Sequence, residues 1–184
     1  MIANSDTEHS TIDLLVFQAL KQYSTAALLS MLVDKDVVVR SAVARELQVR
    51  GGDDVFVLAT SLAKGGRYES REIAAFLLGQ LATPTLPYRN QSIPLLKALL
   101  KDDYYEVRSA AAAALGHLHA EEALHELLSL ATDAEPAVRE CVAFALGFIK
   151  ANEESIAVLQ KLSEEQNKDV RECAGFALEQ HGQK

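Results

Sequence analysis

Apolar and polar residues recur along this chain with the spacing of amphipathic helices, and one such pattern occurs five times. The clearest copies are VRECVAFALG, residues 138–147, and VRECAGFALE, residues 170–179. In every copy a leucine stands seven residues after an arginine, and small or β-branched residues stand three and four residues after that arginine. Spacings of three, four and seven place these side chains on one stripe of a helix. The pattern predicts equivalent amphipathic helices, which we call the inner helices.

The arginines that begin the pattern are spaced by 31 to 37 residues, a period typical of helical repeat arrays. They are Arg40, Arg71, Arg108, Arg139 and Arg171. A second apolar segment precedes each inner helix and predicts an outer helix, at residues 24–33, 53–63, 92–100, 121–131 and 155–163. Helices this short are unstable alone in water, and one pair cannot cover its own apolar stripe. The sequence therefore predicts a stack of helix pairs.

The limits of the array and of its helices also leave signals. Residues 12–23 form an apolar segment without an outer partner and predict a capping helix, so we expect one domain over residues 11–182 and disorder in residues 1–10. Asp36 and Asn167 are predicted N-caps, and Pro136 suits a first helical turn. Gly51 and Gly52 end the first inner helix, and Asp53 or Asp54 is expected to cap the next helix. Two prolines in residues 83–90 predict a longer loop.

The segments LVDKDVVVRSAVARELQ, residues 32–48, and LATDAEPAVRECVAFALG, residues 130–147, resemble HEAT repeats of the short bacterial type found in phycobilisome-lyase-like proteins. The resemblance covers residues 11–182 and implies an all-α, right-handed α-solenoid whose inner helices line the concave side. It also implies a ladder in which each arginine bonds an aspartate six residues earlier, or that of the adjacent repeat. Glu165 is a near match to this pattern, and Gly65 interrupts it, so the ladder is in doubt around residues 64–70. The matching residues are Asp34, Arg40, Arg71, Asp102, Arg108, Asp133, Arg139 and Arg171.

The face of the inner helices opposite the core stripe is expected to carry positions one, five and eight after each arginine and to line the groove. Arg45 stands at position five and Ser41 at position one of the first copy. Phenylalanine and glutamate dominate these positions in the later copies, which predicts an apolar groove with an acidic rim, suited to a basic peptide. Alternatively, the rings pack against neighbouring inner helices. The candidate protein-binding residues are Glu72, Phe76, Ser109, Ala113, Glu140, Phe144, Glu172 and Phe176.

Charge and composition narrow the expected partners. The net charge of −8 is concentrated after residue 101, and an acidic surface repels a phosphate backbone, so we expect no nucleic-acid partner. The same acidic surface either favours a basic partner or only keeps the protein soluble. The apolar segments are too short to span a membrane and the start of the chain does not resemble a secretory signal, so a cytoplasmic location and no membrane partner are expected. Cys141 and Cys173 are one repeat apart and predict free thiols. The oligomeric state stays open.

The sequence offers no catalytic constellation. His117, His119 and His125 match no compact metal motif, and we expect no metal and no cofactor. HEAT-repeat hydroxylases bind di-iron through His-Glu pairs that follow the repeat arginine, whereas this chain has Arg-Glu at Arg71, Arg139 and Arg171. The sequence thus favours a non-catalytic module that binds a protein or peptide. The alternative is a chromophore lyase of phycobiliproteins, or a lyase-like subunit, because that resemblance lies in the same repeats.

Overall fold

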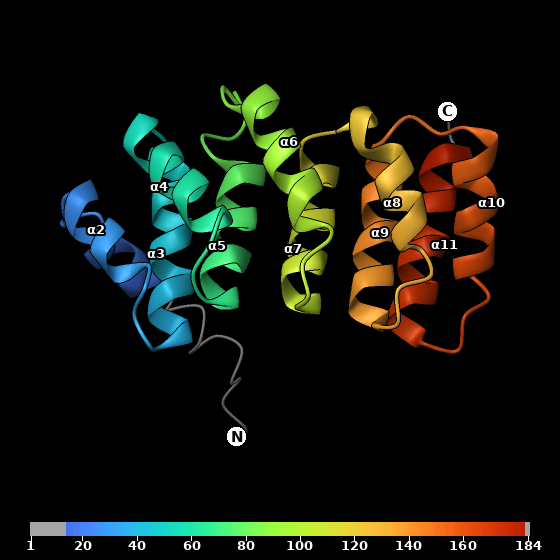
Figure 1. Cartoon of the computed structure of the whole chain (residues 1–184), viewed down its shortest axis with the longest axis horizontal. Helices are drawn as coiled ribbons and strands as arrows, with labels where there is room; N and C mark the ends of the chain where they lie inside the picture. Colours follow the sequence, from blue (N-terminus) through green and yellow to red (C-terminus); the bar gives the residue numbers. More distant parts are fainter. Residues whose placement is uncertain (1–13, 183–184) are drawn as a thin grey trace, which may run out of the picture.

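The computed structural model describes residues 14–182, and these residues form helices and connecting turns without a β-strand. The inner helices are α3 (Val37–Arg50), α5 (Tyr68–Gln80), α7 (Tyr105–His117), α9 (Pro136–Phe148) and α11 (Lys168–Gly182). The outer helices are α2 (Thr25–Met31), α4 (Asp53–Ala63), α6 (Arg89–Leu99), α8 (Leu124–Leu130), which follows a 3-10 turn at Glu121–Ala123, and α10 (Glu153–Leu162). The pairs follow one another along the long axis in chain order (Figure 1). The predicted all-α solenoid is confirmed.

The structure describes part of the N-terminal segment for which the sequence predicts a capping helix. Residues 14–20 are helical, within the capping helix predicted for residues 12–23. Arg50 ties this helix to α3, since Nη1 donates to the Tyr23 carbonyl at 2.7 Å and Nη2 to the Leu20 carbonyl at 2.9 Å. Residues 1–10, for which disorder was predicted, lie outside the described residues.

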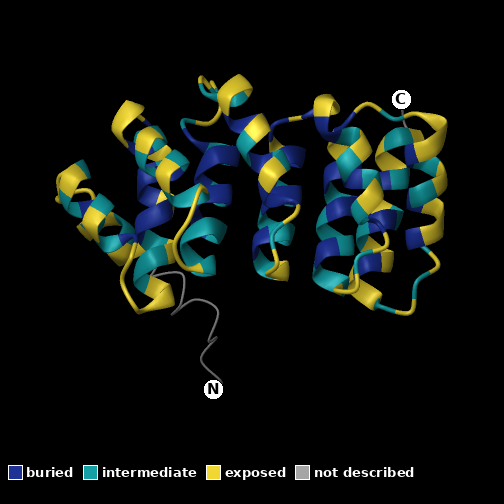
Figure 2. Cartoon of the chain, viewed as in Figure 1, coloured by how far each residue is buried: buried dark blue, intermediate teal, exposed yellow. Residues whose placement is uncertain are grey.

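A continuous apolar core runs between the two layers of helices (Figure 2). The leucine seven residues after the arginine is almost fully buried in the first four pairs, at Leu47, Leu78, Leu115 and Leu146. In the α10–α11 pair Leu178 is half-buried, because no further helix pair covers it within the described residues. Burial of about 25 cal/mol per Å² of apolar surface makes this shared core the main stabilising contribution, and every pair depends on its neighbours for it.

Side-chain caps form at the predicted starts of α3 and α11. The Asp36 carboxylate accepts from the Val38 N–H at 2.8 Å, and the Asn167 amide oxygen accepts from the Val170 N–H at 3.1 Å. Pro136 lies in the first turn of α9. The prediction that Asp53 or Asp54 caps α4 is wrong, because Gly52 takes the N-cap position and both aspartates lie in the first helical turn.

The loop between the second and third pairs is shifted from its predicted position. Helix α6 begins at Arg89, so the connection ends at Tyr88 instead of Asn90. A tertiary contact fixes this start: the Tyr88 hydroxyl bonds the Asp53 carboxylate at 2.7 Å, and its ring stacks on Phe56 with centroids 4.5 Å apart. Such contacts between distant segments leave no local signal in the sequence.

Close approach between inner helices depends on glycine at position eight after the arginine. A Cβ atom on Gly79 would lie 2.5 Å from the Ala114 Cβ, and one on Gly116 would lie 2.8 Å from the Ala145 Cα. The prediction that position eight lines the groove is therefore wrong, because it packs against the next inner helix. Helix α3 carries Gln48 at this position, and α3 contacts α5 less extensively than α5 contacts α7.

Candidate functional site

Three arginines of the inner helices form ion pairs with carboxylates of the next helix pair. Arg71 Nε and Nη2 bond the two Asp102 oxygens at 2.6 and 2.9 Å, and Arg108 bonds Asp133 in the same way at 2.8 and 2.9 Å. The third pair joins Arg139 to Glu165 at 2.7 and 2.6 Å. We call these pairs the ladder, and each of its rungs is bidentate and mostly buried.

The electrostatics of the ladder favour the charged form of both partners. Hydrogen bonds from Arg71 lower the pKa of Asp102, and the same bonds raise the pKa of Arg71. At Asp133 burial acts in the opposite direction, but the hydrogen bonds from Arg108 and from the Glu135 N–H, together with the charges of Arg108 and Arg139, lower its pKa. These carboxylates remain ionised at neutral pH.

The remaining nitrogen of each ladder arginine, Nη1, holds the turn at the start of its own helix. In Arg108 it donates to the carbonyls of Asp102 and Asp103, at 2.9 and 3.1 Å. Arg40 and Arg171 make the equivalent backbone bonds, Arg40 to the carbonyls of Asp34 and Lys35, both at 2.9 Å. Each repeat arginine thus stabilises its own inter-helix turn.

The ladder is interrupted at Arg40. The position that supplies the carboxylate in the other rungs is Gly65 here, and the buried Nε of Arg40 finds no hydrogen-bond partner among the described residues. Asp34, at the N-terminal side, accepts from the Asp36 N–H at 2.8 Å. Arg171 belongs to the last pair and is exposed. The complete rungs therefore connect the second to the fifth pairs.

Positions one and five of the inner helices lie outside the buried stripe, and we call the surface that they form the inner face. Phe176 is 56% exposed, whereas Phe76 and Phe144 are half-buried. Among the glutamates, Glu72 and Glu140 are half-buried and Glu172 is exposed, where it pairs with Lys168 at 3.6 Å. In the α7 copy the candidates Ser109 and Ala113 are half-buried small residues.

Phe144 belongs to an aromatic cluster that the sequence did not indicate. Its ring lies 5.1 Å from the His117 ring and 4.8 Å from the Phe148 ring, and Phe148 in turn lies 5.8 Å from His119. Phe144 thus packs against the preceding inner helix, as the alternative interpretation of these rings expects for it. Phe148 stands nine residues after Arg139, outside positions one, five and eight, which the pattern assigns to the groove.

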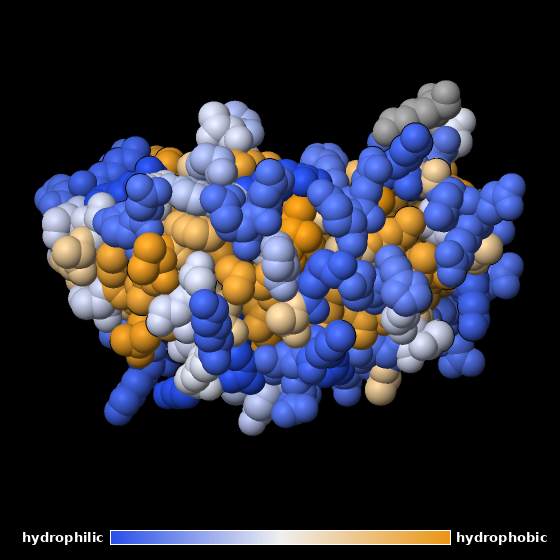
Figure 3. Space-filling model, turned by 45° about the horizontal axis from the view of Figure 1, so that its top comes forward, coloured by the Kyte–Doolittle hydropathy of each residue, from blue (hydrophilic) through white to orange (hydrophobic). Residues whose placement is uncertain are grey.

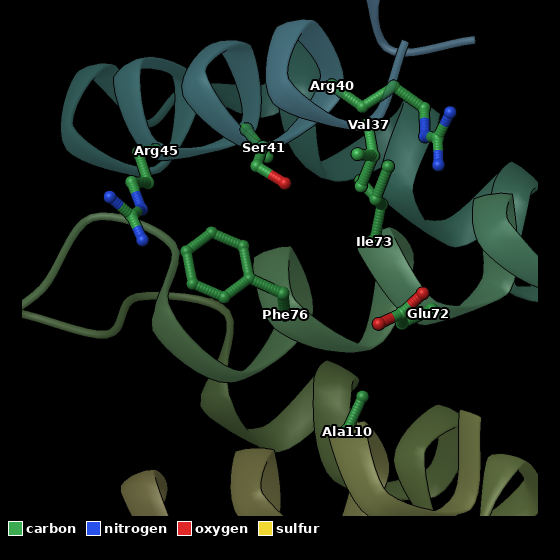
Figure 4. A pocket seen from close by; sticks show the side chains of 9 residues that line it. Val37, Arg40, Ser41, Arg45, Glu72, Ile73, Phe76 and Ala110 are labelled. Atoms are coloured by element: carbon green, nitrogen blue, oxygen red, sulfur yellow. The ribbon is translucent and has the colours of Figure 1, made fainter. Parts of the chain in front are cut away.

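A hollow of about 280 Å³ opens on the inner face between α3 and α5. Figure 4 shows Phe76, Ile73 and Val37 around it, with Arg45 beside the Phe76 ring and Glu72 on the α5 wall. The remaining lining residues are Arg40, Ser41, Ala44 and Ala110. The sequence singled out Glu72 and Phe76 on this face, but Val37 and Ile73 offered no signal because they resemble ordinary core positions. The hollow lies at the junction where Gln48 replaces glycine.

Glu72 supplies the carboxylate that lines this hollow, and its pKa is raised. Burial raises its pKa, the neighbouring Glu106 carboxylate raises it further, and Arg40 only partly compensates. A partly buried carboxylate with a raised pKa is destabilised in its charged form, and a cation placed beside it would relieve that cost.

Within residues 14–182, no three His, Cys, Asp or Glu side chains are grouped so that they could hold a metal ion. The His119 Nδ1 lies 2.8 Å from the Phe148 carbonyl oxygen, so this ring is engaged with the end of α9. Cys141 and Cys173 are free, and burial raises the pKa of Cys141 to about 11, which keeps the thiol protonated and unreactive at neutral pH.

Exposed apolar side chains are concentrated in the first third of the described residues. Val33, Val37, Val38, Val49 and Val57 are each at least 60% exposed. Figure 3 shows the resulting apolar surface near the end where Figure 1 places α2 to α4. No helix in the described part of the chain has the length and apolar character needed to cross a membrane.

Paired helices, a shared leucine core and a ladder between consecutive pairs define a helical-repeat solenoid. The family model of HEAT repeats matches residues 57–133 and 92–179, and the chain belongs to the HEAT-repeat proteins. Protein YibA of Escherichia coli strain K12 is 28% identical over 169 residues, which are 89% of this chain and 60% of YibA. The X-ray structure of YibA superposes with a TM-score of 0.83 at 26% identity, over 94% of this chain and 64% of that one. The chain thus spans less than two thirds of this relative.

Two solved structures of lower identity share the fold. The complex of CpcE and CpcF of phycocyanin lyase from Nostoc sp. PCC7120 has a TM-score of 0.69 at 23% identity, over 88% of this chain and 66% of that one. A designed armadillo repeat protein in complex with the peptide (KR)4 has a TM-score of 0.63 at 18% identity, over 97% of this chain and 95% of that one. At these identities the likeness concerns the arrangement of the helices.

Proposed function

We propose that this chain is a non-catalytic binding module that holds a basic segment of a partner protein on the concave inner face. The observation that carries the proposal is Glu72, whose pKa is raised by burial and by Glu106 while it stands beside an apolar hollow. A lysine or arginine of the partner would stabilise the charged carboxylate, and an adjacent apolar side chain would enter the hollow.

The size of the hollow favours a side chain over a cofactor. Its volume is about 280 Å³, below the range of roughly 300 to 1,000 Å³ that holds drug-sized ligands. Phe76, Ile73 and Ala44 supply apolar walls on which an aliphatic anchor would pack. Glu140 and Glu172 continue the acidic series on α9 and α11, so a segment lying along the inner face would meet further carboxylates.

The comparisons support the feasibility of this mode of binding. The designed armadillo repeat protein is in complex with (KR)4, a peptide of basic residues, and CpcE is in complex with its partner subunit CpcF. A stack of helix pairs with the same overall arrangement thus accommodates a basic peptide in one case and a protein subunit in the other. The recognition residues of this chain must be tested on the chain itself.

The test uses fluorescein-labelled peptides in which one leucine is flanked by lysines and arginines, with fluorescence anisotropy as the measurement. We expect Glu72→Lys and Phe76→Ala each to weaken binding about tenfold, because they remove a charge-assisted contact and an apolar wall. Glu164→Lys is the matched control, since Glu164 is an exposed loop residue and the change in net charge is the same. Equal losses for Glu72→Lys and Glu164→Lys would reduce the interaction to net charge and contradict the proposal.

A chromophore lyase makes a different prediction. Such an enzyme binds a linear tetrapyrrole and changes its absorption spectrum, whereas a peptide-binding module leaves the spectrum unchanged. We expect no spectral change on mixing this chain with a bilin, because a molecule of that size exceeds the hollow between α3 and α5. A bilin spectrum that shifts, and shifts less with Phe76→Ala, would favour the lyase function.

A further inference from the structure

At the interrupted rung of the ladder, Arg40 is held in the position of the other ladder arginines, but the described residues supply no carboxylate to pair with it. In each complete rung, Nη1 holds the backbone while Nε and Nη2 bond a carboxylate of the following pair. Arg40 makes the backbone bonds through Nη1, to Asp34 and Lys35. Its guanidinium is therefore held in place as in the complete rungs.

The unpaired atom of Arg40 is buried, and this distinguishes it from the arginine at the other interrupted position. Nε of Arg40 is inaccessible to solvent and has no hydrogen-bond partner among residues 14–182. Arg171 also has no carboxylate partner among the described residues, but it is exposed and water can solvate it. A buried, unsatisfied donor on a charged group is unfavourable. A bound anion would remove this penalty at Arg40.

Open space adjoins Arg40 where the missing carboxylate would stand. A hollow of about 520 Å³ is lined by Arg40, Lys64, Gly65, Gly66 and Arg67. Two carboxylates also line it: Asp34, which accepts from the Asp36 N–H, and Glu69, which pairs with Arg67. Among the described residues, Arg40 and Lys64 are the cations lining this hollow that form no ion pair with a carboxylate. Arg40 is the one lining residue that this hollow shares with the hollow between α3 and α5, and Figure 4 shows its guanidinium directed away from Phe76.

We propose that the hollow at Arg40 binds a carboxylate of a partner, which completes the ladder between the first and second helix pairs. Two parallel N–H groups of a guanidinium fit the two oxygens of a carboxylate, and the other rungs of this chain show that geometry. Lys64 adds a second positive charge to the site. The carboxylate comes from an acidic side chain or from a chain terminus, and both present the same two oxygens.

The test follows the side-chain Nε–H resonance of Arg40 by NMR during titration with capped peptides. One peptide carries a single aspartate and an amidated end, the second carries only a free C-terminal carboxylate, and the third carries neither. We expect the first or the second to shift the resonance in a saturable way, and the two titrations identify the source of the carboxylate. The proposal is overturned when neither carboxylate peptide shifts the Arg40 resonance. It is also overturned when inorganic phosphate shifts the resonance and the two carboxylate peptides do not.

Gly65→Asp provides the matched variant, because it supplies a carboxylate at the position of the missing one. A Cβ on Gly65 would have no heavy atom within 4 Å, and its backbone lies outside the left-handed region, so the substitution is free of steric conflict. We expect Gly65→Asp to weaken the response to the peptide about tenfold or more, because the new side chain occupies the two donors. Gly65→Asn, which adds the same volume without charge, should retain the response. Identical titrations of both variants would contradict the assignment.

Discussion

Each ladder arginine divides its donors between two helix pairs. Nη1 of Arg139 bonds the carbonyls of Asp133 and Ala134, at 2.8 and 3.2 Å, in the turn that precedes its own helix. Nε and Nη2 bond Glu165 in the following pair. Because one planar guanidinium makes all of these bonds, its five N–H groups fix the turn and the next repeat together, which a lysine cannot do.

Removal of one ladder carboxylate should destabilise the chain measurably. We expect Asp133→Asn to lower the free energy of unfolding by about 1.5–3 kcal/mol, since Arg108 would lose a charged, mostly buried partner. Urea denaturation followed by circular dichroism measures the change. Glu164→Gln removes an exposed carboxylate and should stay within about 0.5 kcal/mol of the unaltered chain. Similar effects of the two substitutions would show that the rung contributes little.

The ladder also predicts how stability depends on pH. The pKa of Asp102 is lowered in the folded state by Arg71. The pKa of Asp133 is lowered, against the effect of burial, by Arg108, the Glu135 N–H and Arg139 together. A lowered folded-state pKa gives a contribution that is complete above the unfolded value of about 3.9 and is lost as the pH falls through the folded value. We therefore expect the free energy of unfolding to decrease when the pH is lowered below about 4. In Asp102→Asn this fall should be smaller, as measured by urea denaturation between neutral and acidic pH.

At the residue scale, the sequence identified the ladder residues but not their pairing. The spacing of Asp102 and Arg108 allows a bond within one repeat or between neighbouring repeats, and only the packing of the pairs selects the second. The aromatic cluster of Phe144 and Phe148 could not be predicted from the sequence for a related reason. The partners His117 and His119 come from the end of the preceding inner helix, and such contacts leave no periodic signal.

At the scale of the elements, glycine sets the distance between consecutive inner helices. Gly79, Gly116 and Gly147 stand at position eight, and the alanines that they contact stand at position six of the next inner helix. Position eight lies on the helix circumference between the buried position four and the accessible positions one and five. The hydrophobic pattern alone does not distinguish whether position eight faces the next inner helix or the groove, and its prediction as a groove position is wrong for this reason.

Substitution of these glycines should separate close packing from helix propensity. Gly79→Ala improves helix propensity, but its Cβ would lie 2.5 Å from the Ala114 Cβ, so we expect a net loss of about 1–3 kcal/mol of stability. Gly175→Ala is the matched control, because a Cβ there would have nothing within 4 Å and should give a gain of about 0.5–1 kcal/mol. Thermal and urea denaturation measure both. A gain for Gly79→Ala would show that α5 and α7 can move apart without loss.

At the scale of the whole molecule, the array is not uniform along its length. The sequence predicted five similar pairs, and the repeated arginine and leucine positions justify that prediction. Gly65 marked a possible interruption of the ladder, yet its structural consequence depends on several features that coincide. Between α3 and α5 a rung is missing, Gln48 replaces glycine, and the helices contact each other less extensively than α5 and α7 do.

This asymmetry predicts that the first helix pair opens separately from the others. In a repeat array, stability is roughly a sum of the stability of each repeat and of its interfaces, so the unit with the weakest interface opens first. We expect backbone amides of α3 to exchange hydrogen through an opening of lower free energy, and weaker urea dependence, than amides of α7 and α9. Native-state hydrogen exchange with mass spectrometry measures this difference. Gly65→Asp should raise the protection of α3 selectively, because its carboxylate would connect α5 to Arg40, whereas Gly65→Asn should not. Equal protection of α3 and α7 in the unaltered chain would mean that the array opens as one cooperative unit, and the missing rung would then have no energetic consequence.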